Sequence, residues 1–246
     1  MIRVTVWNEY LHERELPSVK EVYPEGIHGA IAEFLSKKEE IKVQCSTFFD
    51  ENQGISRELL EETDVLIWWS HARNEELTDE NAGLVAEYVR RGMGFIALHS
   101  AHMCKPLKLL LGSSMTLKWR DNDSERIFVT APAHPIASGL PEYFDLPHEE
   151  MYGEFFDIPK PDDVIFTGWF KGGCVFRSGV TFTRGNGRIF YFQPGHETYP
   201  IYRDENIQRI ITNAVFWASG SRLSNLRDNV HLEEDFLQSK EYNLIC

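Results

Sequence analysis

The chain has 246 residues, of which 42% are hydrophobic, and its formal net charge is −13 at pH 7. This length suffices for one domain with a sizeable hydrophobic core. The excess of acidic residues argues against nucleic acid and anionic membranes as partners. No apolar run is long enough to span a bilayer, and the N-terminal residues do not form a signal-peptide pattern, so we expect a soluble, cytoplasmic protein.

The first half of the chain alternates short apolar runs with amphipathic patterns. Strands are expected at Ile2–Trp7, Ile41–Phe48, Asp64–Ser70 and Gly94–Leu98. Helices are expected at Ile27–Leu35, Leu59–Leu60 and Leu84–Val89. Thr78 is the expected N-cap of the last of these helices, and Gly92 its stop signal. This order predicts an α/β fold with a parallel sheet and helices on both faces.

The second half is less regular and rich in Pro and Gly. Strands are expected at Arg126–Thr130, Val164–Thr167, Cys174–Arg177, Val180–Arg184 and Ile189–Phe192. Gly185-Asn186-Gly187 is a hairpin turn signal, so antiparallel strands should extend the sheet. A final helix is expected at Asn206–Ala218. We expect residues 1–220 to form the domain and residues 221–246 to form a surface tail or an oligomer arm.

Histidines follow several of the predicted strands. His12 and His28 lie in the connection after the first strand, whereas the others are His71, His99, His102 and His196, the last followed by Glu197. Any one of them taken alone is most simply interpreted as a solvated loop residue or as a histidine whose hydrogen bonds are satisfied. The carboxyl ends of parallel strands, however, meet at one edge of the sheet, so these side chains should converge there.

The turn after Leu98 resembles a place where hydrolases and amidotransferases display a nucleophile. A serine elbow at Ser100 would need small residues two positions away on each side, but Leu98 and His102 occupy these positions. Cys104 lies beyond the turn, and the four cysteines form no C-x-x-C pair. We therefore expect no cysteine-dependent glutaminase, and His99 is the residue presented at the turn.

Five ordered motifs together resemble the trehalose-utilisation (ThuA-like) family over residues 2–219. They are Trp68-Trp69-Ser70-His71, Gly92 to Ser100, Pro132-Ala133-His134-Pro135-Ile136, Glu149 to Glu154, and Pro194 to Pro200. The resemblance implies a flavodoxin-like, class I glutamine amidotransferase-like fold that has lost its cysteine nucleophile. It also implies a role in handling disaccharides through their 3-keto derivatives, alongside sugar oxidoreductases.

A keto sugar needs an acid–base pair and often a Lewis acid, which histidines and carboxylates supply. The predicted catalytic residues are His99, His102, Glu150 and Glu197, and the predicted substrate-binding residues are Trp69, Tyr152 and Tyr199. A divalent metal, zinc or manganese, is expected on His28, His71 and His196, with Glu150 as a further candidate ligand. The segment Glu149 to Tyr152 is either an acidic surface turn or a binding loop over the sheet edge.

Three functions remain open from the sequence. The first is a metal-assisted acid–base enzyme of the isomerase, lyase or hydrolase type, acting on a disaccharide or its 3-keto derivative. The second is a non-catalytic sugar-binding or regulatory protein. The third is an accessory subunit of a sugar oxidoreductase. We further expect a homo-oligomer with a small-molecule carbohydrate as ligand.

Overall fold

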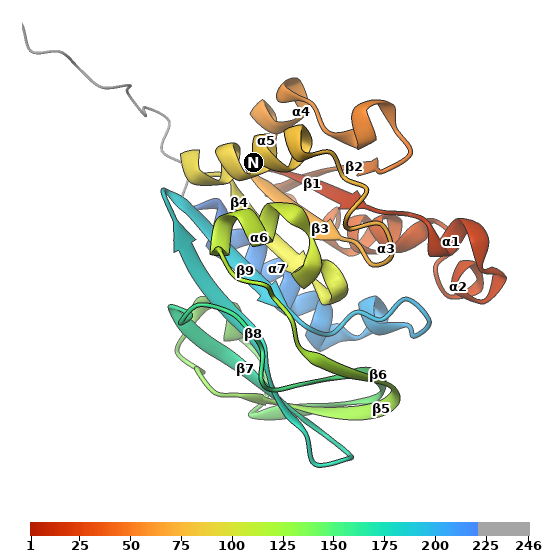
Figure 1. The fold of residues 1–246 in the computed structure, drawn as a ribbon. Coiled ribbons are helices and arrows are strands. Elements are labelled where there is room, and N and C mark those ends of the chain that lie inside the picture. Colours follow the sequence, from red (N-terminus) through yellow and green to blue (C-terminus); the bar gives the residue numbers. More distant parts are fainter. Residues whose placement is uncertain (221–246) are drawn as a thin grey trace, which may run out of the picture.

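The computed structural model describes residues 1–220, and the predicted tail, residues 221–246, lies outside them. One nine-stranded sheet crosses the molecule in the order β2-β1-β3-β4-β9-β8-β7-β5-β6 (Figure 1). Its first five strands are mutually parallel: β1 (Ile2–Asn8), β2 (Ile41–Thr47), β3 (Val65–Trp69), β4 (Gly94–Leu98) and β9 (Gly187–Phe192). With β9 as the fifth strand, this is the 2-1-3-4-5 order of flavodoxin-like folds. The predicted parallel core is confirmed.

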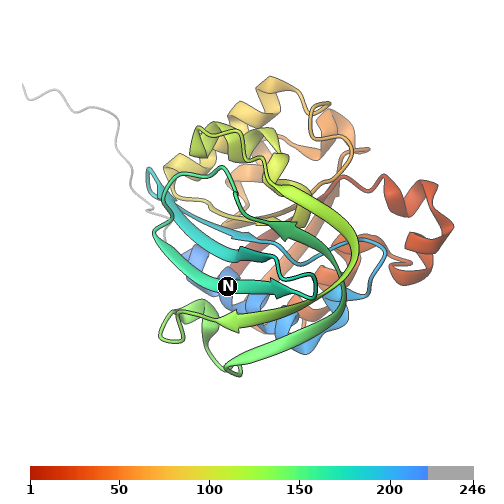
Figure 2. The same ribbon diagram turned by 60° about the horizontal axis from the view of Figure 1, so that its bottom comes forward.

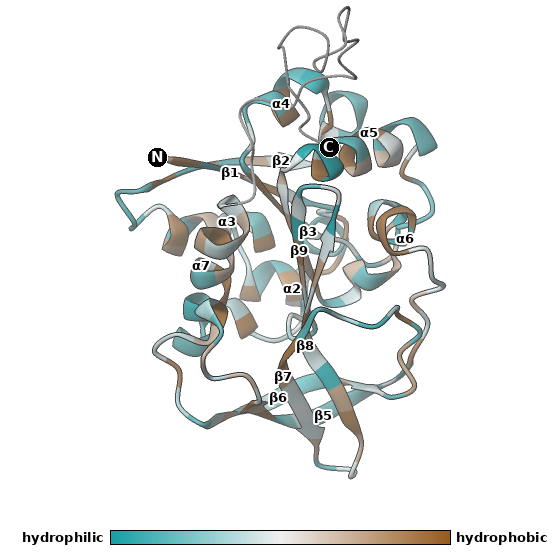
Figure 3. Cartoon of the chain, turned by 90° about the vertical axis from the view of Figure 1, so that its left-hand side faces the viewer, coloured by the Kyte–Doolittle hydropathy of each residue, from teal (hydrophilic) through white to brown (hydrophobic). Residues whose placement is uncertain are grey.

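Helices cover both faces of the parallel strands, which Figure 3 shows with α3 and α7 on one side and α5 and α6 on the other. The helices are α1 (His12–Glu15), α2 (Pro17–Val22), α3 (Gly26–Leu35), α4 (Arg57–Glu61), α5 (Asp79–Arg91), α6 (Lys105–Leu111) and α7 (Glu205–Ser219). Four short 3-10 turns complete the described elements: Glu51–Gly54, His99–Met103, Pro135–Ala137 and Ile201–Arg203.

The inner parallel strands β1, β3, β4 and β9 are buried on both faces because successive side chains enter different cores, whereas the edge strand β2 is partly exposed. In β3, Val65, Ile67 and Trp69 pack with α3 and α7, whereas Leu66 and Trp68 pack with α4, α5 and α6. A strand covered on both sides therefore reads as a continuous apolar run. The hydrophobic colour in Figure 3 accordingly follows the central strands.

The signals that begin and end α5 are confirmed. The Thr78 hydroxyl accepts a hydrogen bond from the Asn81 N–H, which the helix itself leaves without a partner. Gly92 ends the helix with a φ of 123°, which favours glycine.

Four antiparallel strands extend the sheet beyond β9 and curve away from the parallel part (Figure 2). They are β5 (Lys118–Val129), β6 (Tyr143–Gly153), β7 (Asp163–Phe170) and β8 (Val175–Arg184). The predicted hairpin is confirmed, because Arg184 pairs with Gly187 around a Gly185-Asn186 turn. Among residues 1–220, no helix combines the length and apolar character needed to cross a membrane.

Two expectations for the second half were wrong. The segment Glu149 to Tyr152 is neither a surface turn nor a loop, because it is the buried end of strand β6. The two glutamates made a buried strand appear improbable from the sequence, because carboxylates are buried only where they find partners inside the protein. The two runs expected at Cys174–Arg177 and Val180–Arg184 form one strand, β8, whose pairing with β7 shifts register between them.

Candidate functional site

Histidines from four different connections meet at the carboxyl edge of the parallel sheet. The ring of His71, which follows β3, lies 4.9 Å from the ring of His12 and 6.3 Å from that of His99. The His99 ring in turn lies 5.5 Å from the ring of His196, which follows β9. The predicted convergence of strand ends is therefore confirmed. These histidines are far apart in the sequence, and the parallel topology brings the connections that carry them together.

A cavity of about 580 Å³ opens above this cluster. It is lined by His12, His71, Asn74, Ser100, His102, Met103, Thr116, Leu117, Trp119, Asp121, Glu150, Tyr152, His196 and Glu197. Its volume lies within the range of small-molecule sites, about 300–1,000 Å³. None of these fourteen described lining residues is Lys or Arg. The cavity therefore suits a cation or a neutral molecule better than an anion.

His99 lies at the sharp turn after β4, as expected, and its φ of 53° is unusual for a residue with a side chain. Its Nδ1–H donates to the Gln193 carbonyl at 2.8 Å, which turns Nε2 toward the Glu150 carboxylate 3.1 Å away. The ring also stacks on Tyr152, with centroids 5.1 Å apart. Burial lowers the pKa of His99, but the negative charges of Glu150, Glu149 and Glu197 outweigh burial and raise it to about 9.

His102 has the opposite character. Its Nδ1–H donates to the Met115 carbonyl at 2.7 Å. Burial lowers the pKa of His102 to about 4, so the ring is neutral near pH 7 and its Nε2 can accept a proton. Two buried histidines three residues apart thus differ strongly in proton affinity, a pattern typical of an acid and a base in one site.

Several side chains of the cluster could together hold a cation. His12, His71 and Glu197 each offer one atom within 4.8 Å of the others, and so do His71, His99 and Glu150. Two further groups of this kind involve His196: one with His99 and Glu197, the other with Asp121 and Glu150.

Four buried atoms of the cluster have no aligned hydrogen-bond partner among the described residues: Nδ1 of His12, Nε2 of His99, Oε2 of Glu150 and Oε2 of Glu197. Two of these atoms nevertheless face carboxylates: Nδ1 of His12 lies 3.0 Å from Glu197, and Nε2 of His99 lies 3.1 Å from Glu150. A bound ion could replace these ion pairs and meet the need of buried polar atoms for partners. Burial also lowers the pKa values of His71 and His196, which keeps the imidazoles neutral and able to bind a metal.

Two fully buried carboxylates support the histidine-bearing loops. The sequence analysis gave Glu9 no role, and it placed Glu149 only in a candidate surface turn or binding loop. The Glu9 carboxylate accepts hydrogen bonds from the backbone N–H groups of His71, Ala72 and Arg73 at 2.8–3.0 Å. The Glu149 carboxylate accepts from the N–H groups of Gly195 and His196 at 3.0 and 3.3 Å. Glu9 directly follows β1, so its position at a strand end could have identified it as a candidate site residue from the sequence.

Three predicted site residues lie away from the cavity lining. His28 points its Nδ1 at the Asn8 amide, 3.0 Å away, and belongs to none of the metal-capable groups of the described residues. Trp69 is completely buried and donates its indole N–H to the Gly195 carbonyl, so it supports the wall from behind. Tyr199 contacts the His196 ring, and its hydroxyl donates to Asn122.

The remaining predicted residues, His71, His102, Glu150, Tyr152, His196 and Glu197, line the cavity, and His99 lies directly behind Glu150 and Tyr152. His12, which was not among the predicted ligands, joins them through a 3.0 Å ion pair with Glu197. Cys104, by contrast, is buried, and burial raises the pKa of its thiol to about 12. Such a thiol is a poor nucleophile.

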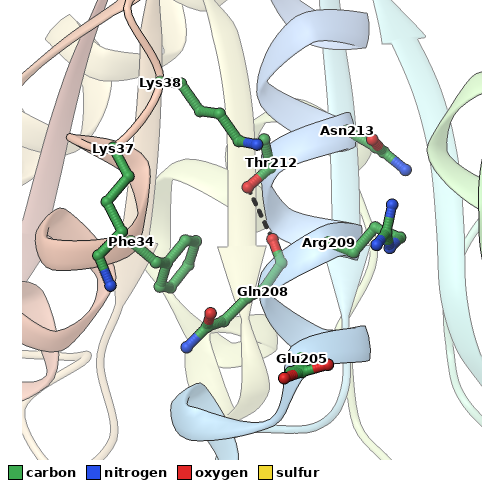
Figure 4. Close-up of a pocket in the computed structure, with 8 residues that line it drawn as sticks. All are labelled: Phe34, Lys37, Lys38, Glu205, Gln208, Arg209, Thr212 and Asn213. Carbon is green, nitrogen blue, oxygen red and sulfur yellow. Dashed lines mark hydrogen bonds between the residues drawn. The ribbon is translucent and has the colours of Figure 1, made fainter.

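A second hollow of about 340 Å³ lies between α3 and α7 (Figure 4). Lys37 and Lys38 border it from the end of α3, and Arg209 and Glu205 from α7. No histidine is among its eight lining residues, all of which Figure 4 labels. We therefore assign the chemistry to the cavity above the histidine cluster.

Known structures share this architecture at low sequence identity. A putative ThuA-like protein from Parabacteroides merdae superposes with a TM-score of 0.64 at 14% identity, covering 92% of each chain. One from Bacteroides uniformis gives 0.63 at 17% identity, covering 88% of this chain and 90% of that chain. A cytoplasmic protein from Salmonella typhimurium gives 0.60 at 13% identity, covering 88% and 99% respectively. These likenesses concern the fold.

The search of curated proteins gives no significant match. The sequence model of the family described as "ThuA: Trehalose utilisation", however, matches residues 3–218. This match spans nearly all of the described domain, including every residue of the histidine cluster. The chain therefore belongs to the ThuA trehalose-utilisation family.

Proposed function

We propose that the chain is a metal-assisted acid–base enzyme acting on a neutral carbohydrate, a disaccharide or its 3-keto derivative. Membership of the family supports a broad role in carbohydrate utilisation. The observation that carries the proposal is the pair His99 and His102 beside one cavity: Nε2 of His99 faces the Glu150 carboxylate at 3.1 Å, whereas Nδ1–H of His102 donates to the Met115 carbonyl. Their pKa values accordingly move in opposite directions. We also propose a cytoplasmic location, which the description of the Salmonella typhimurium structure supports.

In this proposal, His99 is the proton donor. Its Nδ1–H is held by the Gln193 carbonyl, and Glu150 stabilises the charged ring through Nε2. His102 is the base, because Met115 holds its Nδ1–H and leaves Nε2 unprotonated. Glu150 reaches the cavity lining, so it can pass a proton between the His99 ring and a bound sugar.

The metal would be held by His12, His71 and Glu197, with His196 beside them. His12 takes the place expected for His28. Two imidazoles and one carboxylate match the preferences of zinc and manganese. When bound, the ion would act as a Lewis acid toward a sugar oxygen. Glu9 and Glu149 hold the backbone of the His71 and His196 loops from behind, which fixes the points from which these side chains project.

The test follows a 3-keto-disaccharide by NMR in the presence of the protein and zinc or manganese. We expect turnover by the parent, and a loss of about 100-fold or more in kcat for His99→Ala, because a positioned acid contributes about 10²–10⁴. Cys104→Ser, at the residue that directly follows this turn, is the control and should retain activity.

Three outcomes contradict the proposal. Sugar binding without turnover would indicate a binding or regulatory protein. Turnover only after addition of a sugar oxidoreductase would indicate an accessory subunit. Loss of activity in Cys104→Ser but not in His99→Ala would assign the chemistry to the thiol.

A further inference from the structure

The cavity is chemically divided between its floor and its mouth. The floor carries the buried or half-buried ionisable groups, among them His71, Glu150 and Glu197. One stretch of chain supplies the more exposed part of the lining: Thr116, Trp119 and Asp121 are exposed, and Leu117 is half-buried. Asp121 is the one ionisable residue of this stretch that lines the cavity. A ligand that fills the cavity would thus have one part at the reacting groups and another part at the mouth.

Trp119 is the large aromatic residue at the mouth of the cavity. It lies at the start of β5, and 62% of its surface is exposed although it is the largest kind of side chain. Folding therefore makes little use of its apolar area. Asp121, two residues later, offers an atom within 4.8 Å of ligand atoms on Glu150 and His196, so this stretch of chain comes close to the reacting groups.

Strand pairing connects Trp119 with the centre of the site. Trp119 lies directly opposite Tyr152 in the antiparallel pair β5–β6, so both side chains emerge on the same face of the sheet. Tyr152 in turn stacks on His99. Strand register therefore places the exposed Trp119 beside the buried Tyr152, whose ring stacks on the proposed proton donor.

We propose that Trp119 is the stacking platform for a second sugar ring, one that binds but does not react. This inference rests on the proposed function and assigns the binding of the second, non-reacting ring of its substrate to one side chain. Pyranose rings present apolar C–H faces that stack on aromatic side chains, and an exposed indole offers the largest such surface. The reacting ring would lie over His71 and Glu150, and its neighbour would lie on Trp119.

The test compares trehalose with glucose by isothermal titration calorimetry on the full chain. We expect the parent to bind trehalose more tightly than glucose. Trp119→Ala should weaken trehalose binding by about tenfold and leave glucose binding unchanged. Trp119→Phe, which keeps an aromatic platform, should recover most of the loss.

Trp169→Ala is the matched control. Trp169 is also an exposed tryptophan, 44% accessible on β7, but it is not among the residues that line the cavity. Its removal should change neither affinity. If Trp119→Ala left trehalose binding unchanged, or weakened the binding of both sugars equally, the role of Trp119 would be contradicted while the proposed function would stand. A parent protein that binds neither sugar would contradict the proposed function as well.

Discussion

At the scale of single residues, two histidines of the same turn receive opposite proton affinities from their partners. Both use Nδ1–H to donate to a backbone carbonyl, of Gln193 for His99 and of Met115 for His102. They differ in what faces Nε2 and in nearby charge: His99 meets the Glu150 carboxylate, whereas burial dominates at His102. The sequence shows both histidines but neither carbonyl partner, so their roles could not be separated before the fold was known.

Glu125 leads to a prediction about pH and stability. This residue is buried on β5 and accepts a hydrogen bond from the Ser178 hydroxyl at 2.6 Å. Burial raises the pKa of Glu125 well above its usual value. The folded state therefore keeps a proton that the unfolded chain has already lost. Above the unfolded pKa, stability must fall as pH rises, by up to about 1.4 kcal/mol per pH unit.

Glu125→Gln removes this proton while nearly keeping the shape of the side chain. We expect the variant to lose less stability than the parent between about pH 6 and about pH 9, because the amide does not ionise. Urea unfolding at both pH values measures the difference. Glu142→Gln, at an exposed position, is the control and should follow the parent. Identical pH slopes for Glu125→Gln and the parent would contradict the account of Glu125.

At the scale of elements, the site depends on how closely helices approach the parallel strands. Strand β4 begins at Gly94, against the end of α7. A Cβ atom at Gly94 would lie 2.7 Å from the Cβ of Ala218 and 3.0 Å from its carbonyl oxygen. Neither neighbour is a flexible side chain, so α7 would have to move.

We therefore expect Gly94→Ala to lower the free energy of unfolding by about 1–3 kcal/mol, as overpacking typically does. Gly83→Ala is the matched comparison, because a Cβ at this position of α5 meets no atom within 4 Å. It should raise the free energy of unfolding by about 0.5–1 kcal/mol, since alanine favours the helix. Urea unfolding of both variants measures these free energies. A Gly94→Ala protein as stable as the parent would show that α7 does not pack closely against Gly94.

The elements differ in how readily the sequence reveals them. Strand β4 was predicted with its observed bounds because a short apolar run between Gly92 and His99 has clear limits. Strand β6 was missed because Pro147, His148 and two glutamates resemble a loop, and only tertiary partners such as the N–H groups of Gly195 and His196 satisfy Glu149 inside the protein.

At the scale of the whole molecule, the parallel topology creates the site. From the sequence, this topology predicts which loops meet but not which of their side chains enter the site. It was enough to predict that His71, His99 and His196 converge, since each follows a strand of the same sheet. It could not give the direction of each side chain. His28 shares the β1 connection with His12, yet it turns toward Asn8 while His12 reaches Glu197.

Equilibrium binding of zinc and manganese to chelator-treated protein would measure directly whether the histidine cluster binds a divalent metal. We expect the parent to bind about one ion per chain and His71→Ala to lose affinity by at least about 100-fold, because losing a ligand costs more than losing a group behind one. His28→Ala should bind like the parent. Absence of binding by the parent, or equal binding by parent and His71→Ala, would contradict the account.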